Sequence, residues 1–157
     1  MRKNPARLSA LLGGACLLAG CASGPQTQAL APAGFDRVTV GGELRQRIER
    51  NFDRLETDYY QPDQVYWTEE QSGGWPGDKE GRTILALVLD AQASGRTPLY
   101  LDELIRRLPR ELNAKGYLGS ILEGSADEQQ LSGHGWLLRG LCEYYAWKKD
   151  PQVLEIA

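Results

Sequence analysis

Apolar residues recur every three or four positions through most of the chain after residue 41, which is the spacing of one face of an α-helix. In the stretch LYLDELIRRLPREL, five such residues fall on one side of a helix: Leu101, Leu104, Ile105, Leu108 and Leu112. The alternation of apolar and polar residues that a half-buried strand requires does not extend over any comparable length. The sequence therefore predicts an all-α fold.

Two helices are expected before residue 96. The first covers about Glu43–Tyr60 and carries its apolar stripe on Leu44, Ile48, Phe52, Leu55 and Tyr59. The second begins near Asp78, which could cap it, with Glu80 in the first turn, and it ends at Gly95. Between them, residues 61–81 read as a long ordered loop, and loops of this length usually carry function.

Three further helices are expected after residue 96. Pro109 should kink the helix over residues 99–112 or end its first part. A fourth helix runs from about Gly133 to Lys148, and a fifth starts with Asp150 as N-cap and Pro151 at its first position. Short turns alternate with long glycine-rich loops along the chain, which predicts a series of antiparallel helical hairpins.

The N-terminus has the layout of a secretory signal segment, residues 1–20, in which basic residues precede an apolar stretch. The sequence LLAGC ending at Cys21 resembles the lipobox of bacterial lipoproteins, in which the cysteine is lipidated. An ordinary signal peptide cleaved after GCA is the alternative. Residues 21–40 then form the lipidated cysteine and a flexible tether, and residues 41–157 the folded domain. Because Ala22 follows the cysteine, the resemblance implies an extracytoplasmic protein anchored in the outer membrane.

Cysteine count and charge exclude several classes of protein. Cys16 leaves with the signal segment and Cys21 carries the lipid, so Cys142 is alone and no disulfide or cysteine metal cluster is expected. We expect Cys142 to be a buried core thiol. The net charge of −3 with mixed signs gives no indication of a nucleic-acid surface.

The stretch SGGWPGDKEGR places an aromatic ring beside charged groups at a helix start. Trp75 could stack on a sugar face, while Asp78, Glu80 and their basic neighbours Lys79 and Arg82 could hydrogen-bond its hydroxyls. The alternative is that Trp75 covers the end of the helix and the acids cap it.

Two more candidate residues lie in the second half of the chain. Tyr117, in AKGYLGSIL, could present its ring to a pocket or simply pin the loop to the core. His134, the only histidine, is expected in the first turn of the fourth helix, where the helix dipole favours the neutral ring. It could contact a sugar or serve as a structural cap.

The three stretches WPGDKEGRTILALVLDAQASG, LDELIRRLPRELNAKGYLGSI and LSGHGWLLRGLCEYYAWKKDPQVLEIA, in this order, resemble the N-terminal part of the catalytic domain of β-L-arabinofuranosidase-like glycoside hydrolases (family 127). The resemblance covers about Trp67 to Ala157 and implies part of an (α/α)₆ toroid. It also implies that His134 helps to bind a terminal furanose. Gly135 and Leu141 stand where the family motif has a glutamate and a second histidine.

The resemblance further implies a cysteine nucleophile held by zinc with nearby glutamates, all from later in the toroid. We therefore expect the catalytic residues beyond residue 157, no cofactor in this piece and zinc in a full-length enzyme. The chain reads as a truncated glycoside hydrolase that removes terminal β-L-arabinofuranosyl or related residues from plant or microbial glycans, with the remainder of the toroid as a missing partner. The alternatives are a lipoprotein that binds glycans without cleaving them, and a helical lipoprotein whose exposed edge is covered by another chain.

Overall fold

The computed structural model describes residues 32–66 and 75–157. The chain divides into a unit of residues 1–32 and a compact unit of residues 33–157, and only the second is described below. Its secondary structure is helical, and no strand occurs among the described residues, which confirms the all-α prediction. The signal segment and Cys21 lie outside the described residues, as do residues 67–74 of the first long loop. None of the helices described is long and apolar enough to cross a membrane.

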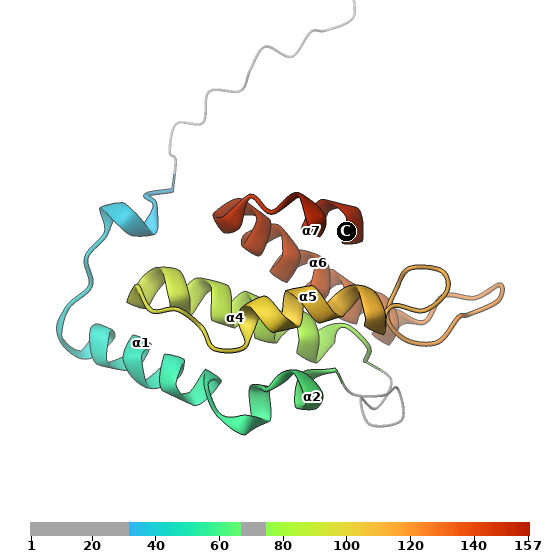
Figure 1. Ribbon diagram of the computed structural model, residues 1–157, viewed down its shortest axis with the longest axis horizontal. Coiled ribbons are helices and arrows are strands. Elements are labelled where there is room, and N and C mark those ends of the chain that lie inside the picture. The colour runs from blue at the N-terminus through green and yellow to red at the C-terminus, as the bar shows by residue number, and fades with distance from the viewer. Residues whose placement is uncertain (1–31, 67–74) are drawn as a thin grey trace, which may run out of the picture. The chain divides into compact units, whose positions relative to one another are not determined.

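The helices follow one another along the chain in Figure 1 as η1 (Phe35–Arg37), α1 (Gly42–Leu55), η2 (Asp58–Tyr60), α2 (Pro62–Val65), α4 (Asp78–Ser94), α5 (Leu101–Glu111), α6 (Glu128–Lys148) and α7 (Pro151–Ile156).

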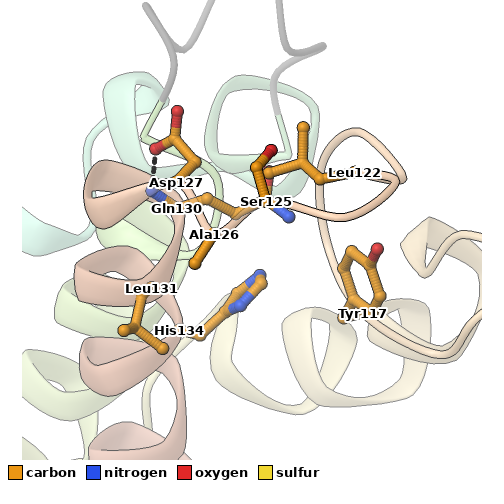
Figure 2. A pocket seen from close by; sticks show the side chains of 8 residues that line it. All are labelled: Tyr117, Leu122, Ser125, Ala126, Asp127, Gln130, Leu131 and His134. Carbon is orange, nitrogen blue, oxygen red and sulfur yellow. Dashed lines mark hydrogen bonds between the residues drawn. The ribbon is translucent and has the colours of Figure 1, made fainter.

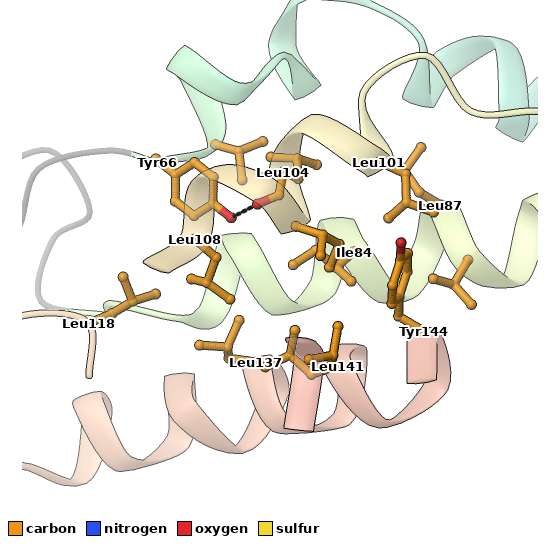
Figure 3. Packing of buried hydrophobic residues seen from close by; sticks show 14 of the residues in the cluster. Tyr66, Ile84, Leu87, Leu101, Leu104, Leu108, Leu118, Leu137, Leu141 and Tyr144 are labelled. Carbon is orange, nitrogen blue, oxygen red and sulfur yellow. Dashed lines mark hydrogen bonds between the residues drawn. The ribbon is translucent and has the colours of Figure 1, made fainter. Parts of the chain in front are cut away.

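Helix α4 is central to the packing, because it contacts α1, α2, α5 and α6. Its apolar residues meet those of α5 on one side and those of α6 on the other (Figure 3). The fully buried members of this core include Ile84, Leu87, Val88, Leu101, Leu104, Leu108 and Leu141. Burying each such side chain contributes about 1.5–3 kcal/mol to folding, so these contacts fix how the helices sit against one another.

Glycines allow α4 and α6 to cross with their backbones in contact. A Cβ atom added at Gly81 would lie 2.2 Å from the backbone nitrogen of Leu137, and one at Gly140 would lie 2.7 Å from the carbonyl oxygen of Gly81. Near the start of α4, a Cβ on Gly133 would lie 2.2 Å from the carbonyl oxygen of Pro76. Any larger residue at these positions would push the two helices apart.

Two predicted helix boundaries are confirmed. Helix α4 ends at Ser94 and is followed by Gly95 as its C-cap, whose φ of 76° is the left-handed conformation that favours glycine at a helix C-terminus. Helix α7 has Pro151 in its first turn, and the Asp150 side chain accepts a hydrogen bond of 3.0 Å from the backbone N–H of Gln152. The cap of α4 is shifted by one residue, because Gly77 is its N-cap and Asp78 is already helical.

Two other expectations about helix ends were wrong. The first helix stops at Leu55, and Leu44 and Tyr59 are exposed, so only part of the predicted stripe is buried. Helix α6 starts at Glu128, five residues before Gly133, because Asp127 caps it. Pro109 lies inside α5, as predicted, and the helix continues through it to Glu111, since a proline in the last turn removes only one hydrogen bond.

Candidate functional site

The three segments that carry the predicted site residues meet at one end of the α4–α6 pair. A Cβ on Gly77, just before α4, would lie 2.9 Å from the backbone carbonyl of Gly133 and 3.1 Å from the backbone nitrogen of His134. A Cβ on Gly119, in the loop after α5, would lie 2.5 Å from the Pro76 ring. The start of α4, the loop around Tyr117 and the second turn of α6 are therefore in direct contact.

Asn113 shapes the loop that carries Tyr117. Its side-chain oxygen accepts a 2.9 Å hydrogen bond from the backbone N–H of Lys115, and its side-chain N–H₂ donates to the carbonyl of Gly119 at 2.9 Å. The backbone N–H of Asn113 also donates to the carbonyl of Tyr117 at 2.8 Å. In a tight turn, side-chain hydrogen bonds of this kind satisfy backbone groups that would otherwise bond within a helix. The position of Tyr117 is therefore set by its own loop.

His134 projects from α6 toward that loop (Figure 2). Its Nε2 donates to the carbonyl oxygen of Leu118 at 2.9 Å, so Nδ1 of the neutral ring is an acceptor. The ring of Tyr117 meets the imidazole edge-on, with centroids 5.7 Å apart and an angle of 64° between the planes. Because α6 begins at Glu128, the expected place of His134 in the first turn was wrong, and the helix-dipole argument does not apply to it.

Tyr117 and His134 line a pocket of about 250 Å³ between α6 and the loop before it (Figure 2). Its other lining residues are Leu122, Ser125, Ala126, Asp127, Gln130 and Leu131. Drug-sized ligands occupy pockets of roughly 300–1,000 Å³, so this one suits a single sugar unit or a ligand of similar size. The lining combines two rings with hydroxyl, amide and carboxylate groups.

Trp75, Asp78 and Glu80 do not line this pocket, although they lie on the segment that contacts the Tyr117 loop and α6. Trp75 is 40% exposed. Asp78 pairs with Arg82 at 2.9 Å, and the Arg82 guanidinium lies 4.6 Å from the centre of the Trp136 ring.

Glu80 is only 3% exposed, and its carboxylate accepts a 2.9 Å hydrogen bond from the backbone N–H of Gly77. Burial raises the pKa of Glu80 to about 7, and the hydrogen bond from Gly77 opposes part of that increase. The carboxylate thus closes the first turn of α4, as in a capping box.

The Lys79 ammonium, beside Glu80 on α4, donates to the carbonyl of Gln64 at 2.6 Å and lies 4.1 Å from the centre of the Tyr59 ring. It ties the start of α4 to the segment containing η2 and α2.

The prediction that Cys142 is a buried core thiol was wrong, because the residue is exposed. Leu137, Gly140, Leu141 and Tyr144 turn toward α4 and the core, which leaves Cys142 on the opposite side of α6. Across residues 32–66 and 75–157, no three His, Cys, Asp or Glu side chains lie close enough together to hold a metal ion.

Two residues that line the pocket, Asp127 and Gln130, were not predicted from the sequence. Asp127 accepts a 2.8 Å hydrogen bond from the backbone N–H of Gln130 and so starts α6. The Gln130 side chain, 8% exposed, donates to the carbonyl of Ser120 at 3.1 Å. The sequence D-x-x-Q is a capping signal, and it could have located both residues.

No protein-family model, curated protein or solved structure matches this chain significantly.

Proposed function

We propose that this chain binds a carbohydrate in the Tyr117–His134 pocket and is the N-terminal part of a glycoside hydrolase that acts on terminal β-L-arabinofuranosyl or related residues. The observation that carries the proposal is the contact among the start of α4, the Tyr117 loop and the second turn of α6. These are the segments that resemble the β-L-arabinofuranosidase-like enzymes, and they are distant in the sequence.

The chemistry of the pocket supports a sugar ligand. Sugars present both C–H faces, which stack on aromatic rings, and hydroxyls, which need donors and acceptors. The Tyr117 ring, the Nδ1 acceptor of His134 and the Asp127 carboxylate supply both kinds of contact around one small space.

The architecture follows from the same resemblance, and the location follows from the resemblance of LLAGC to a lipobox. We propose that the α4–α5 and α6–α7 pairs are hairpins of an (α/α)₆ toroid, and that Cys21 is lipidated and anchors the protein on the extracytoplasmic side of the outer membrane. The short links Gly95–Tyr100 and Lys149–Asp150 support the hairpins, since short links join antiparallel neighbours.

The described residues of the pocket would contact the sugar. The donor set for a zinc-held thiolate is not assembled within residues 32–66 and 75–157. Cys142 lies eight residues after His134 and on the outward side of α6.

A second candidate is glycan binding without cleavage. It is favoured because the two predicted site acids, which could have protonated a leaving group, are engaged in contacts within the protein. Glu80 is buried and bound to the Gly77 N–H, and Asp78 is paired with Arg82. Neither carboxylate faces the pocket.

Saturation-transfer NMR with methyl β-L-arabinofuranoside tests sugar binding. We expect transfer to the sugar protons with the native chain and its loss in Tyr117→Ala and in His134→Gln, which keeps an N–H for the Leu118 carbonyl. Tyr59→Ala is the matched control, because Tyr59 is an exposed tyrosine that does not line the pocket. Equal transfer in all four proteins, or none in the native chain with any arabinoside, contradicts the proposal.

Sequencing the gene past codon 157 separates the two candidates. An in-frame continuation that contains a Glu-x-Cys and a cysteine pair supports the hydrolase. A stop codon at that point, together with sugar binding by this chain, supports the second candidate.

A further inference from the structure

Two adjoining cavities lie at the C-terminal end of α4, and none of their lining residues belongs to the Tyr117–His134 pocket. Gly34 and Phe35 line both cavities, so the segment that precedes α1 covers the two together. In Figure 1 this segment, which contains η1, passes beside the end of α4. We call residues 33–40 the cover segment.

The first cavity has a volume of about 250 Å³, and every residue around it is apolar or glycine. Phe35 and Val38 are 47% and 53% exposed, so the rim is apolar as well. Protein interiors are close-packed, and the atoms around an unfilled apolar space lack contacts on one side. An apolar group that entered the cavity would supply those contacts. The lining residues are Ala33, Gly34, Phe35, Val38, Val40, Ile48 and Ala93.

The size and lining of this first cavity favour an alkyl chain. A cavity of roughly 150 Å³ with an apolar lining holds a benzene molecule, so 250 Å³ suits about eight to ten carbon atoms. No lining side chain offers a hydrogen bond, so the hydroxyls of a sugar would be buried there at a cost.

The second cavity is larger, at about 570 Å³, and it carries the charged groups. Arg96 is already paired with Asp53 at 2.7 Å. The Asp36 carboxylate folds back over Gly34, where a Cβ atom would collide with it. Lys148 forms no ion pair with any described residue, and its ammonium lies 3.8 Å from the centre of the Trp147 ring. Lys148 is therefore available to an anionic group.

We infer that the two cavities bind a single-chain amphiphile, a fatty carboxylate of about ten carbons. Its alkyl chain lies in the first cavity, and its carboxylate lies in the second, near Lys148. One molecule can occupy both spaces because Phe35 and Gly34 form a wall of each. An apolar space next to an unpaired cation matches the two ends of such a molecule.

The cover segment is held in a way that allows a ligand to enter. Its one hydrogen bond among the described residues joins the Arg37 N–H to the Gly34 carbonyl at 3.0 Å, within η1. No hydrogen bond or ion pair within the described part of the chain joins the segment to α1, α4 or α6. Apolar side chains hold it there, and such contacts are not directional. The segment can therefore move aside without breaking a hydrogen bond to the helices.

Isothermal titration calorimetry with carboxylates of six to fourteen carbons tests the apolar cavity. The full chain carries Cys21→Ser, so that no acyl group can be attached at that residue. We expect the affinity to increase about fourfold per added methylene and to level off at about ten carbons, where the cavity is full. No binding, or an increase that continues to fourteen carbons, overturns the inference.

Variants of the apolar cavity locate the alkyl chain. Val38→Asp places a charge at the exposed rim, and Ala93→Leu fills the space from α4. Each should weaken decanoate binding at least tenfold, and the exposed position of Val38 keeps the first result independent of the folding of α4. Leu154→Asp is the control, because Leu154 is 57% exposed and lines neither cavity. Equal effects of Val38→Asp and Leu154→Asp overturn the inference.

A charge change tests the carboxylate site. Lys148→Gln should weaken decanoate binding at least threefold and leave decanol binding unchanged, whereas Lys115→Gln, outside both cavities, should affect neither. Equal affinity for decanoate and decyltrimethylammonium, or equal effects of the two lysine variants, overturns the assignment of an anionic head. Tyr117→Ala should leave decanoate binding unchanged, so the inference and the proposed function can fail separately.

Discussion

Glu80 should make the protein less stable as the pH rises from about 4.5 to 7. Burial raises the pKa of this carboxyl from 4.5 to about 7 in the folded state. Between these values the folded chain binds more protons than the unfolded chain, so the free energy of unfolding falls with increasing pH. The contribution of Glu80 is thus fully present below its unfolded pKa and is lost as the pH passes its folded pKa.

The size of the effect follows from the pKa difference. Each pKa unit corresponds to about 1.4 kcal/mol, so the increase from 4.5 to about 7 costs the folded state about 3 kcal/mol once Glu80 is ionised. Glu80→Gln removes the charge and keeps an oxygen that can accept from the Gly77 N–H. The variant should therefore match the native protein near pH 4 and exceed its free energy of unfolding by about 3 kcal/mol at pH 8.

Urea unfolding followed by tryptophan fluorescence, at intervals from pH 4 to 8.5, gives both curves. The difference between variant and native protein isolates Glu80, because the other carboxyls titrate equally in both. Asp78, Lys79 and Tyr66 are the charged or titratable groups that interact with it. A difference that stays constant with pH, or a native protein that gains relative stability as the pH rises, would refute the reasoning.

Four further substitutions test the helix packing, a buried hydrogen bond and the cap of α6. Gly81→Ala should lower the free energy of unfolding by about 2 kcal/mol or more, because its Cβ would lie 2.2 Å from the α6 backbone and overpacking typically costs about 1–3 kcal/mol. Gly135→Ala has open space around its Cβ, so it should instead raise the free energy of unfolding by up to about 1 kcal/mol. Urea unfolding of the two variants compares these effects. Tyr66→Phe should cost about 1–2 kcal/mol in urea, because the Tyr66 hydroxyl donates to the buried carbonyl of Leu104. Asp127→Ala should lower helicity by circular dichroism and cost about 1 kcal/mol, and an unchanged melting temperature would contradict its role as the cap of α6.

Local signals in the sequence located some helix ends well. Gly95 and the Asp150–Pro151 pair act through their own backbone conformation and capping bonds, so they needed no tertiary information. The start of α6 could not be located in this way. Packing of α6 against α4 holds Gly133 inside a helix, where propensity alone would begin one.

The candidate site could be predicted as a set of segments but not as a set of contacts. Tyr117 and His134 share a pocket because the α4–α6 crossing and the Asn113 turn bring them together, and neither cause is visible in residue spacing. Cys142 was misplaced because the apolar residues on both sides of α6 left its orientation undetermined. The glycines that face α4 decide that orientation.

The glycine contacts between α4 and α6 also have a consequence for how the chain finds its alignment during folding. Sliding α6 by one residue would move Ser132 or His134 into the gap beside Pro76 that only Gly133 fits, and Arg139 or Leu141 into the gap beside Gly81 that only Gly140 fits. Leucines alone would tolerate several neighbouring alignments, because their contacts are similar in each. Only one alignment of α6 on α4 places glycines at both close contacts. Replacing these glycines should therefore lower the stability and also allow more than one alignment of the two helices.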